Sequence, residues 1–184
     1  MCSSKRPGST ASAESATLPV LCTLPDISLL NPAEPATAEA VVALLRVAHA
    51  QEAALLHGAG VAPMLARSEA QVQASRELHL GAFVDDALAG LLCVGPGEAA
   101  DELVITTLVV HPRAQRQGLA RALVATAIAR APGAAWCVNA TERNAPALAL
   151  YAGLGFVQRR RGSLQGADGT VVAMLQLHRA ATAG

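Results

Sequence analysis

The residues best suited to chemistry lie in one block of the chain, 102–157. Within it, Gln115–Ala120 has the form Gln-x-x-Gly-x-Ala and separates a β-branched run from an amphipathic stretch. The backbone N–H groups of such a turn, with the positive end of a following helix, can bind a pyrophosphate. Gly118 lets an anion approach the backbone closely, and Arg116 and Arg121 can add positive charge at the rim. The alternative is a plain strand-to-helix connection with surface arginines.

A second group of residues follows downstream, after a predicted helix and strand. Its pattern is Asn144-x-x-Ala147-x-x-Leu150-Tyr151-x-x-x-Gly155-Phe156. Tyr151 is the only tyrosine in the chain, and a phenol of pKa ~10 can donate a proton to a departing thiolate whose thiol has a pKa of ~8.5. The alternative for Tyr151 is helix packing. Asn144 can cap the helix, which does not exclude contact with a ligand.

Together, the order and spacing of these two motifs resemble the GNAT superfamily of N-acetyltransferases, which move an acyl group from acyl-coenzyme A to an amine. The resemblance implies that Tyr151 is the general acid near the thioester sulfur. It also implies that the pyrophosphate lies on the turn and that the pantetheine arm pairs with the end of a strand. The residues that it assigns to acetyl-coenzyme A are Leu108, Val109, Val110, Gln115, Arg116, Gln117, Gly118, Leu119, Ala120, Arg121 and Asn144.

The general base is less well defined than the acid. An amine with a pKa of ~10.4 is almost fully protonated at pH 7 and attacks only after losing a proton. GNAT enzymes that acetylate ribosomal-protein N-termini carry a glutamate at the position that Asn139 occupies here. Glu102, at the start of a predicted central strand, is the best remaining candidate. A solvated strand-end charge at Glu102, with a water relay as the base, is the alternative.

The elements that must position these residues follow from periodicity and turn residues. Alternating or continuous apolar runs predict strands at 24–30, 77–84, 87–94, 102–110, 134–139, 156–161 and 170–178. Helical spacing and stop residues predict helices at 37–57, 68–75, 119–130 and 144–154. With the resemblance, this predicts an α/β fold. The resemblance implies a twisted, mostly antiparallel sheet of about seven strands that is flanked by about four helices and splays in a V at the cofactor site.

Length and composition predict a single domain over 21–184, which the resemblance implies is a GNAT domain, after a disordered tail over 1–20 that is rich in Ser, Ala, Thr and Pro. The formal net charge is zero, from 14 basic and 14 acidic residues, so nucleic acid is not an expected partner. No apolar run reaches the ~18 residues of a membrane span. The four cysteines include no Cys-x-x-Cys pair, so we expect no metal site and a cytoplasmic protein. The oligomeric state is open, with a homodimer as one option.

Three functions remain to be compared. The first is transfer of an acetyl group from acetyl-coenzyme A to a primary amine, on a small molecule or a protein. The attack is direct, since no Cys or Ser lies in the motif, and a backbone N–H near Val109 stabilises the oxyanion. The second is a non-catalytic acyl-coenzyme A-binding module, which a missing base favours and Tyr151 disfavours. The third is a tRNA-modifying or toxin-like protein, whose basic face would have to come from Arg159–Arg161.

Overall fold

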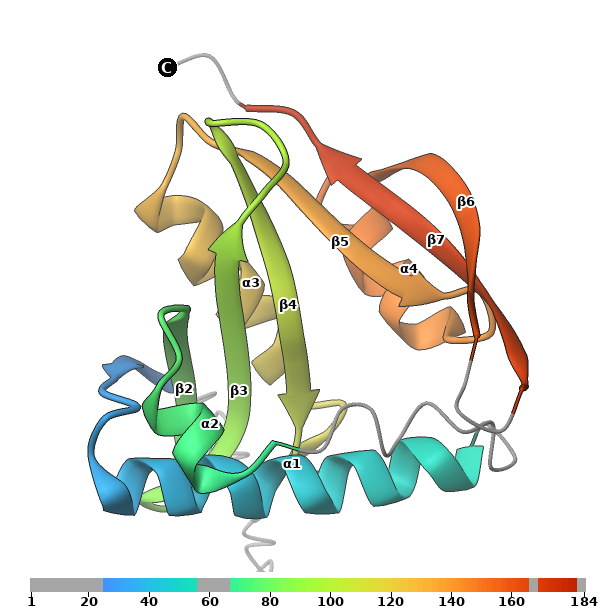
Figure 1. The fold of residues 1–184 in the computed structure, drawn as a ribbon. Coiled ribbons are helices and arrows are strands. Elements are labelled where there is room, and N and C mark those ends of the chain that lie inside the picture. The colour runs from blue at the N-terminus through green and yellow to red at the C-terminus, as the bar shows by residue number, and fades with distance from the viewer. Residues whose placement is uncertain (1–24, 56–66, 166–168, 182–184) are drawn as a thin grey trace, which may run out of the picture.

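The computed structural model describes residues 25–55, 67–165 and 169–181 of the 184-residue chain. Within these ranges seven strands form one sheet in the order β1-β2-β3-β4-β5-β7-β6 (Figure 1). The strands are β1 (Asp26–Leu30), β2 (Leu78–Val84), β3 (Ala87–Pro96), β4 (Glu102–Val110), β5 (Ala135–Thr141), β6 (Val157–Gln165) and β7 (Val171–Arg179). Neighbouring strands are antiparallel except β4 and β5, which are parallel, so the predicted mixed sheet is confirmed. The tail predicted over 1–20 lies outside the described residues.

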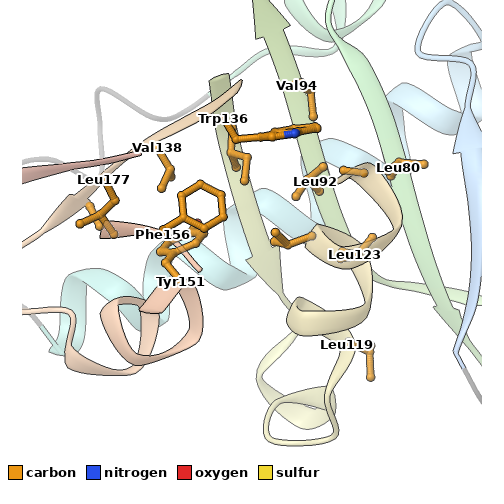
Figure 2. Close-up of a cluster of buried hydrophobic side chains, with 14 of the residues drawn as sticks. Leu80, Leu92, Val94, Leu119, Leu123, Trp136, Val138, Tyr151, Phe156 and Leu177 are labelled. Atoms are coloured by element: carbon orange, nitrogen blue, oxygen red, sulfur yellow. The ribbon is translucent and has the colours of Figure 1, made fainter. Parts of the chain in front are cut away.

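Helices cover both faces of the sheet. They are α1 (Pro35–Leu55), α2 (Glu69–Gln73), α3 (Leu119–Arg130) and α4 (Ala145–Ala152), with the short 3-10 helix η2 (Pro112–Ala114) before α3. α1 and α2 lie on one face, and α3 and α4 on the other (Figure 1). The larger core lies beneath α3 and α4 and is built around Trp136, Leu123 and Phe156 (Figure 2). A second cluster joins α1 and α2 to Leu91 and Cys93 of β3.

Local sequence explains where several elements begin and end. Asp85 and Asp86 have positive φ angles of 50° and 61°, which a tight hairpin between twisted strands requires, and the predicted β2–β3 hairpin is confirmed. β6 differs from its prediction because it does not end at 161. Its pairing with β7 continues through Gly162 to Gln165, so tertiary pairing overrides the weak strand propensity of glycine.

The sheet opens between its two parallel strands. β4 and β5 pair only over Glu102–Ile105 and Ala135–Val138. Beyond that point β4 stays paired with β3, and the rest of β5 pairs with β7. A bulge sets in at Thr106, because neighbouring residues of β3 pair with Ile105 and Thr107. The strands then diverge (Figure 1), which confirms the predicted V and leaves one backbone edge of β4 facing the gap.

Candidate functional site

The turn before α3 presents backbone to open space. Arg116 and Gly118 both have positive φ, 64° and 86°. A Cβ atom at Gly118 would meet nothing within 4 Å. Gly118 is the N-cap of α3 and gives no side-chain hydrogen bond to it. The first N–H groups of α3 therefore need acceptors from elsewhere, and an anion is the acceptor that the helix end favours.

Two glutamines of the motif hold this turn in shape. The Gln115 amide nitrogen donates to the Val110 carbonyl at 3.2 Å and to Gln51 of α1 at 2.6 Å. The Gln117 amide donates to the Arg113 carbonyl at 3.2 Å. We predicted both glutamines as cofactor-binding residues from the motif. Because the side-chain amides of both glutamines make these internal bonds, the groups that these residues can offer a ligand are their backbone N–H groups.

A hollow of about 540 Å³ lies between the start of α3 and α4, here called the α3–α4 hollow. Arg121 spans these two helices, with Nη1 3.2 Å from the Gly153 carbonyl. Most of the residues predicted to bind the coenzyme lie here, and Gln117 is one that does not line it. The lining residues are Leu108, Val110, Ala114, Gln115, Arg116, Gly118, Leu119, Ala120, Arg121, Pro146, Ala147, Ala149 and Leu150.

A second hollow, of about 370 Å³, opens between α1 and the parted strands, here called the α1-side hollow. Its lining residues are Leu45, His49, Arg67, Ile105, Thr106, Thr107, Leu108, Val109, Val138, Asn139, Ala140, Thr141, Asn144, Ala147, Tyr151, Leu164 and Met174. Leu108 and Ala147 line both hollows. The two hollows are therefore neighbours across Leu108 and Ala147, and the predicted acid Tyr151 and the predicted ligand Asn144 line the second of them.

Tyr151 is fixed by its surroundings. Its side chain is 4% exposed, and its ring packs edge-on against Phe156 with centroids 5.4 Å apart (Figure 2). Burial raises the pKa of Tyr151 well above its usual value, so the phenol stays protonated and can donate. Asn144 caps α4, because its Oδ1 accepts a hydrogen bond from the Ala147 N–H at 3.1 Å. The capping bond does not use the Asn144 amide nitrogen, which is the group that could donate to a ligand.

Glu102 lies at the start of β4, at the opposite end of the strand from Leu108, which lines both hollows. It is 7% exposed and accepts hydrogen bonds from Arg159 at 3.3 Å and from the Glu98 N–H at 3.1 Å. It lines neither of the two hollows. The structure therefore does not bring our predicted base to the other predicted site residues, and its contacts favour a structural role.

This position gives a direct test of the Glu102 assignment. Glu102→Gln should lower stability by about 1–3 kcal/mol, because a buried charge-assisted pair is lost. The kcat of the folded variant should stay within a few-fold of the wild-type kcat. Denaturant unfolding and steady-state kinetics measure the two effects. A loss of kcat of ~10²-fold at unchanged stability would restore Glu102 as the base.

Sequence reasoning did not assign His49 or Arg67 to the site. His49 follows Leu45 by one helical turn, on the face of α1 that covers the sheet. A polar residue continuing an apolar stripe was the available signal. Arg67 carried no signal, since it precedes a short helix.

Glu77, His79 and Cys93 could ligate a cation, because their ligand atoms lie within 4.8 Å of one another. However, Arg67 already supplies positive charge to Glu77 at 2.6 Å.

Comparison with known proteins identifies the family. The model of the Acetyltransferase (GNAT) family matches residues 45–156. The chain belongs to the GNAT family. The match begins within α1 at Leu45 and ends at Phe156, so it contains most of the residues that line the two hollows.

GNAT relatives agree in fold. A mycothiol acetyltransferase of Mycolicibacterium smegmatis is 35% identical over 60% of this chain, which spans 38% of that relative's length. The Escherichia coli ribosomal-protein-S18-alanine N-acetyltransferase superimposes with a TM-score of 0.68 at 23% identity, covering 88% of this chain and 96% of its own. A GNAT acetyltransferase from Streptococcus pneumoniae gives 0.62 at 18% identity, covering 84% and 98%. These structures share the GNAT fold with this chain.

Among the described helices of this chain, none is long and apolar enough to cross a membrane.

Proposed function

We propose that this GNAT protein moves an acetyl group from acetyl-coenzyme A to a primary amine by direct attack. The observation that supports the proposal is that Leu108 and Ala147 line both hollows, one on each side of the parted strands. One hollow includes the turn before α3, whose backbone N–H groups could bind an anion, and the other opens on the α1 side of the parted strands. A donor and an acceptor can thus reach the same point from different sides.

The coenzyme would occupy the α3–α4 hollow. Its pyrophosphate would accept from N–H groups of the turn and the first residues of α3, with Arg116 and Arg121 at the rim. Hydrogen bonds to charged groups contribute ~1.5–3 kcal/mol each, and the helix dipole ~0.3–1 kcal/mol, so the amides dominate. The pantetheine arm would pair with the open edge of β4 at Leu108–Val110, as an added strand does.

The chemistry needs one proton removed and one supplied. The amine nitrogen attacks the thioester carbonyl carbon, an N–C bond forms, and the resulting oxyanion accepts from a backbone N–H near Val109. As the C–S bond breaks, Tyr151 donates its proton to the sulfur. His49 takes the proton from the amine, directly or through water, because an imidazole changes charge near neutral pH.

Turnover separates this proposal from a non-catalytic acyl-coenzyme A-binding module. The protein should release coenzyme A thiol from acetyl-coenzyme A at a rate that depends on an added amine. His49→Gln should lower kcat about tenfold or more, since general-base assistance is lost but water remains. A thiol-reactive dye measures release, and calorimetry measures binding. Tight binding with no amine-dependent release from any of a broad set of amines would favour the binding module.

We also propose that the protein acts in the cytoplasm. Cys93 and Cys137 are free thiols and both are buried. Burial raises the pKa of both, that of Cys93 to about 12, so neither is poised to react. Unpaired, unreactive thiols suit a reducing compartment.

A further inference from the structure

One arginine side chain lines the α1-side hollow. It belongs to Arg67, which directly precedes the N-cap Ser68 of α2. Ser68 and Gln71 form a reciprocal capping box, which fixes the backbone here. Arg67 Nη1 lies 2.6 Å from Glu77 Oε2, and the two side chains are 32% and 19% exposed. The backbone of Arg67 is therefore held by the capped start of α2, and its guanidinium group is held by Glu77.

Glu77 is arranged to keep this cation in place. Burial of its carboxylate acts to raise its pKa, but hydrogen bonds from Arg67 and Thr106 and the charge of Arg67 outweigh burial, and the net shift is downward. The Ser75 hydroxyl donates to the same carboxylate at 3.3 Å. The pKa of Arg67 is raised in turn by its bond to Glu77. The pair thus stays ionised at neutral pH.

The pair is asymmetric toward the hollow. Arg67 lines it, and Glu77 does not. Among the described residues that line this hollow, Arg67 is the one with a permanent charge, and none carries a carboxylate. The other polar lining groups are His49, Thr106, Thr107, Asn139, Thr141, Asn144 and Tyr151. The wall therefore offers an incoming acceptor a cation and neutral groups.

We infer that Arg67 selects an acceptor that carries an anionic group, a carboxylate or a phosphate, beside its amine. A guanidinium has several N–H donors in a planar fork, and the bond to Glu77 engages one of its terminal nitrogens. The remaining donors suit the paired oxygens of such an anion. The inference rests on the proposed function, because it names what the acceptor side of that site recognises. Glu77 is the positioning residue that orients the fork.

Matched acceptor pairs test this inference. Each pair differs in one anionic group: leucine against leucinamide for a carboxylate, and phosphoethanolamine against ethanolamine for a phosphate. The wild-type kcat/KM should favour the anionic member of at least one pair about tenfold or more. Arg67→Gln should remove that preference by lowering the anionic kcat/KM about 10–100-fold, while the neutral member changes less than about twofold.

The control variant is Arg76→Gln, which removes an exposed arginine that lines neither of these two hollows. It should keep the wild-type preference. If Arg67→Gln fails to fold, Arg67→Lys keeps the charge without the fork and should show an intermediate preference. Equal kcat/KM within both pairs, with amines still acetylated, overturns the inference and leaves the proposed function standing. So does a loss that is equal for charged and neutral acceptors. Absence of acetyl-coenzyme A binding and turnover overturns both.

Discussion

Replacing Tyr151 by phenylalanine should lower kcat about 10²–10⁴-fold, the usual contribution of a general acid. The variant keeps the ring and its edge-on contact with Phe156 at 5.4 Å, so only the hydroxyl is lost. The departing thiolate then has to take its proton from water. The KM for acetyl-coenzyme A should change little, because Tyr151 does not line the α3–α4 hollow. Steady-state kinetics at saturating amine measure the loss.

The pH profile distinguishes an acid from a packing residue. Because burial raises the pKa of Tyr151, the phenol remains protonated up to at least pH ~10, its ordinary titration range. Ionisation of Tyr151 should therefore not limit wild-type activity below that pH. Phe156→Leu is the control for packing, since it should lower the melting temperature and leave kcat within a few-fold. A Tyr151→Phe variant with wild-type kcat at every pH would show that the tyrosine only packs.

Gly118→Asp should weaken acetyl-coenzyme A binding about 10²-fold or more. The new carboxylate would lie at the N-cap of α3 and repel the pyrophosphate, with the loss of two or more hydrogen bonds to charged oxygens. The fold should persist at some cost in stability, because a Cβ atom at this position meets nothing within 4 Å and aspartate can adopt the positive φ of 86°. Isothermal calorimetry measures the affinity, and thermal unfolding checks the fold.

Two variants separate charge from strain and from general surface effects. Gly118→Asn has the same shape without the charge and tolerates the positive φ of 86°, so it should lose much less affinity. Gly133→Asp adds the same charge at another glycine with open space around it, beyond α3, and should bind normally. If the Asp and Asn variants of Gly118 bind equally well, the turn is not the pyrophosphate site.

The sequence predicted those parts of the fold that depend on local chemistry. The Asp85-Asp86 turn and the alternation around it specified a hairpin, which the structure contains. The position of β7 between β5 and β6 is not encoded in any local pattern, because it results from which buried faces fit together. The parting of β4 and β5 was expected from the resemblance alone, since the composition of Leu108–Val110 does not distinguish an open edge from a paired one.

The candidate site was predictable to a similar degree. The turn around Gly118 and the helix carrying Asn144 and Tyr151 were recognisable because their residues are close together in sequence. His49 and Arg67 were not, because only tertiary packing brings α1 and the start of α2 over the parted strands. For Glu102, the sequence indicated the central strand that carries it. It did not indicate that Glu102 lies at the end of this strand where β4 and β5 are still paired.

The short ladder between β4 and β5 has a thermodynamic consequence. The backbone pairing that joins the two halves of the sheet covers only Glu102–Ile105 on β4, so much of their cohesion comes from side chains such as Trp136. A molecule that pairs with the open edge of β4 and also contacts β5 would take the place of a missing strand between the two halves. Folding free energy and substrate affinity would then be linked through the same hydrogen bonds. The open edge of β4 beyond Ile105 would have backbone partners only while the donor is bound.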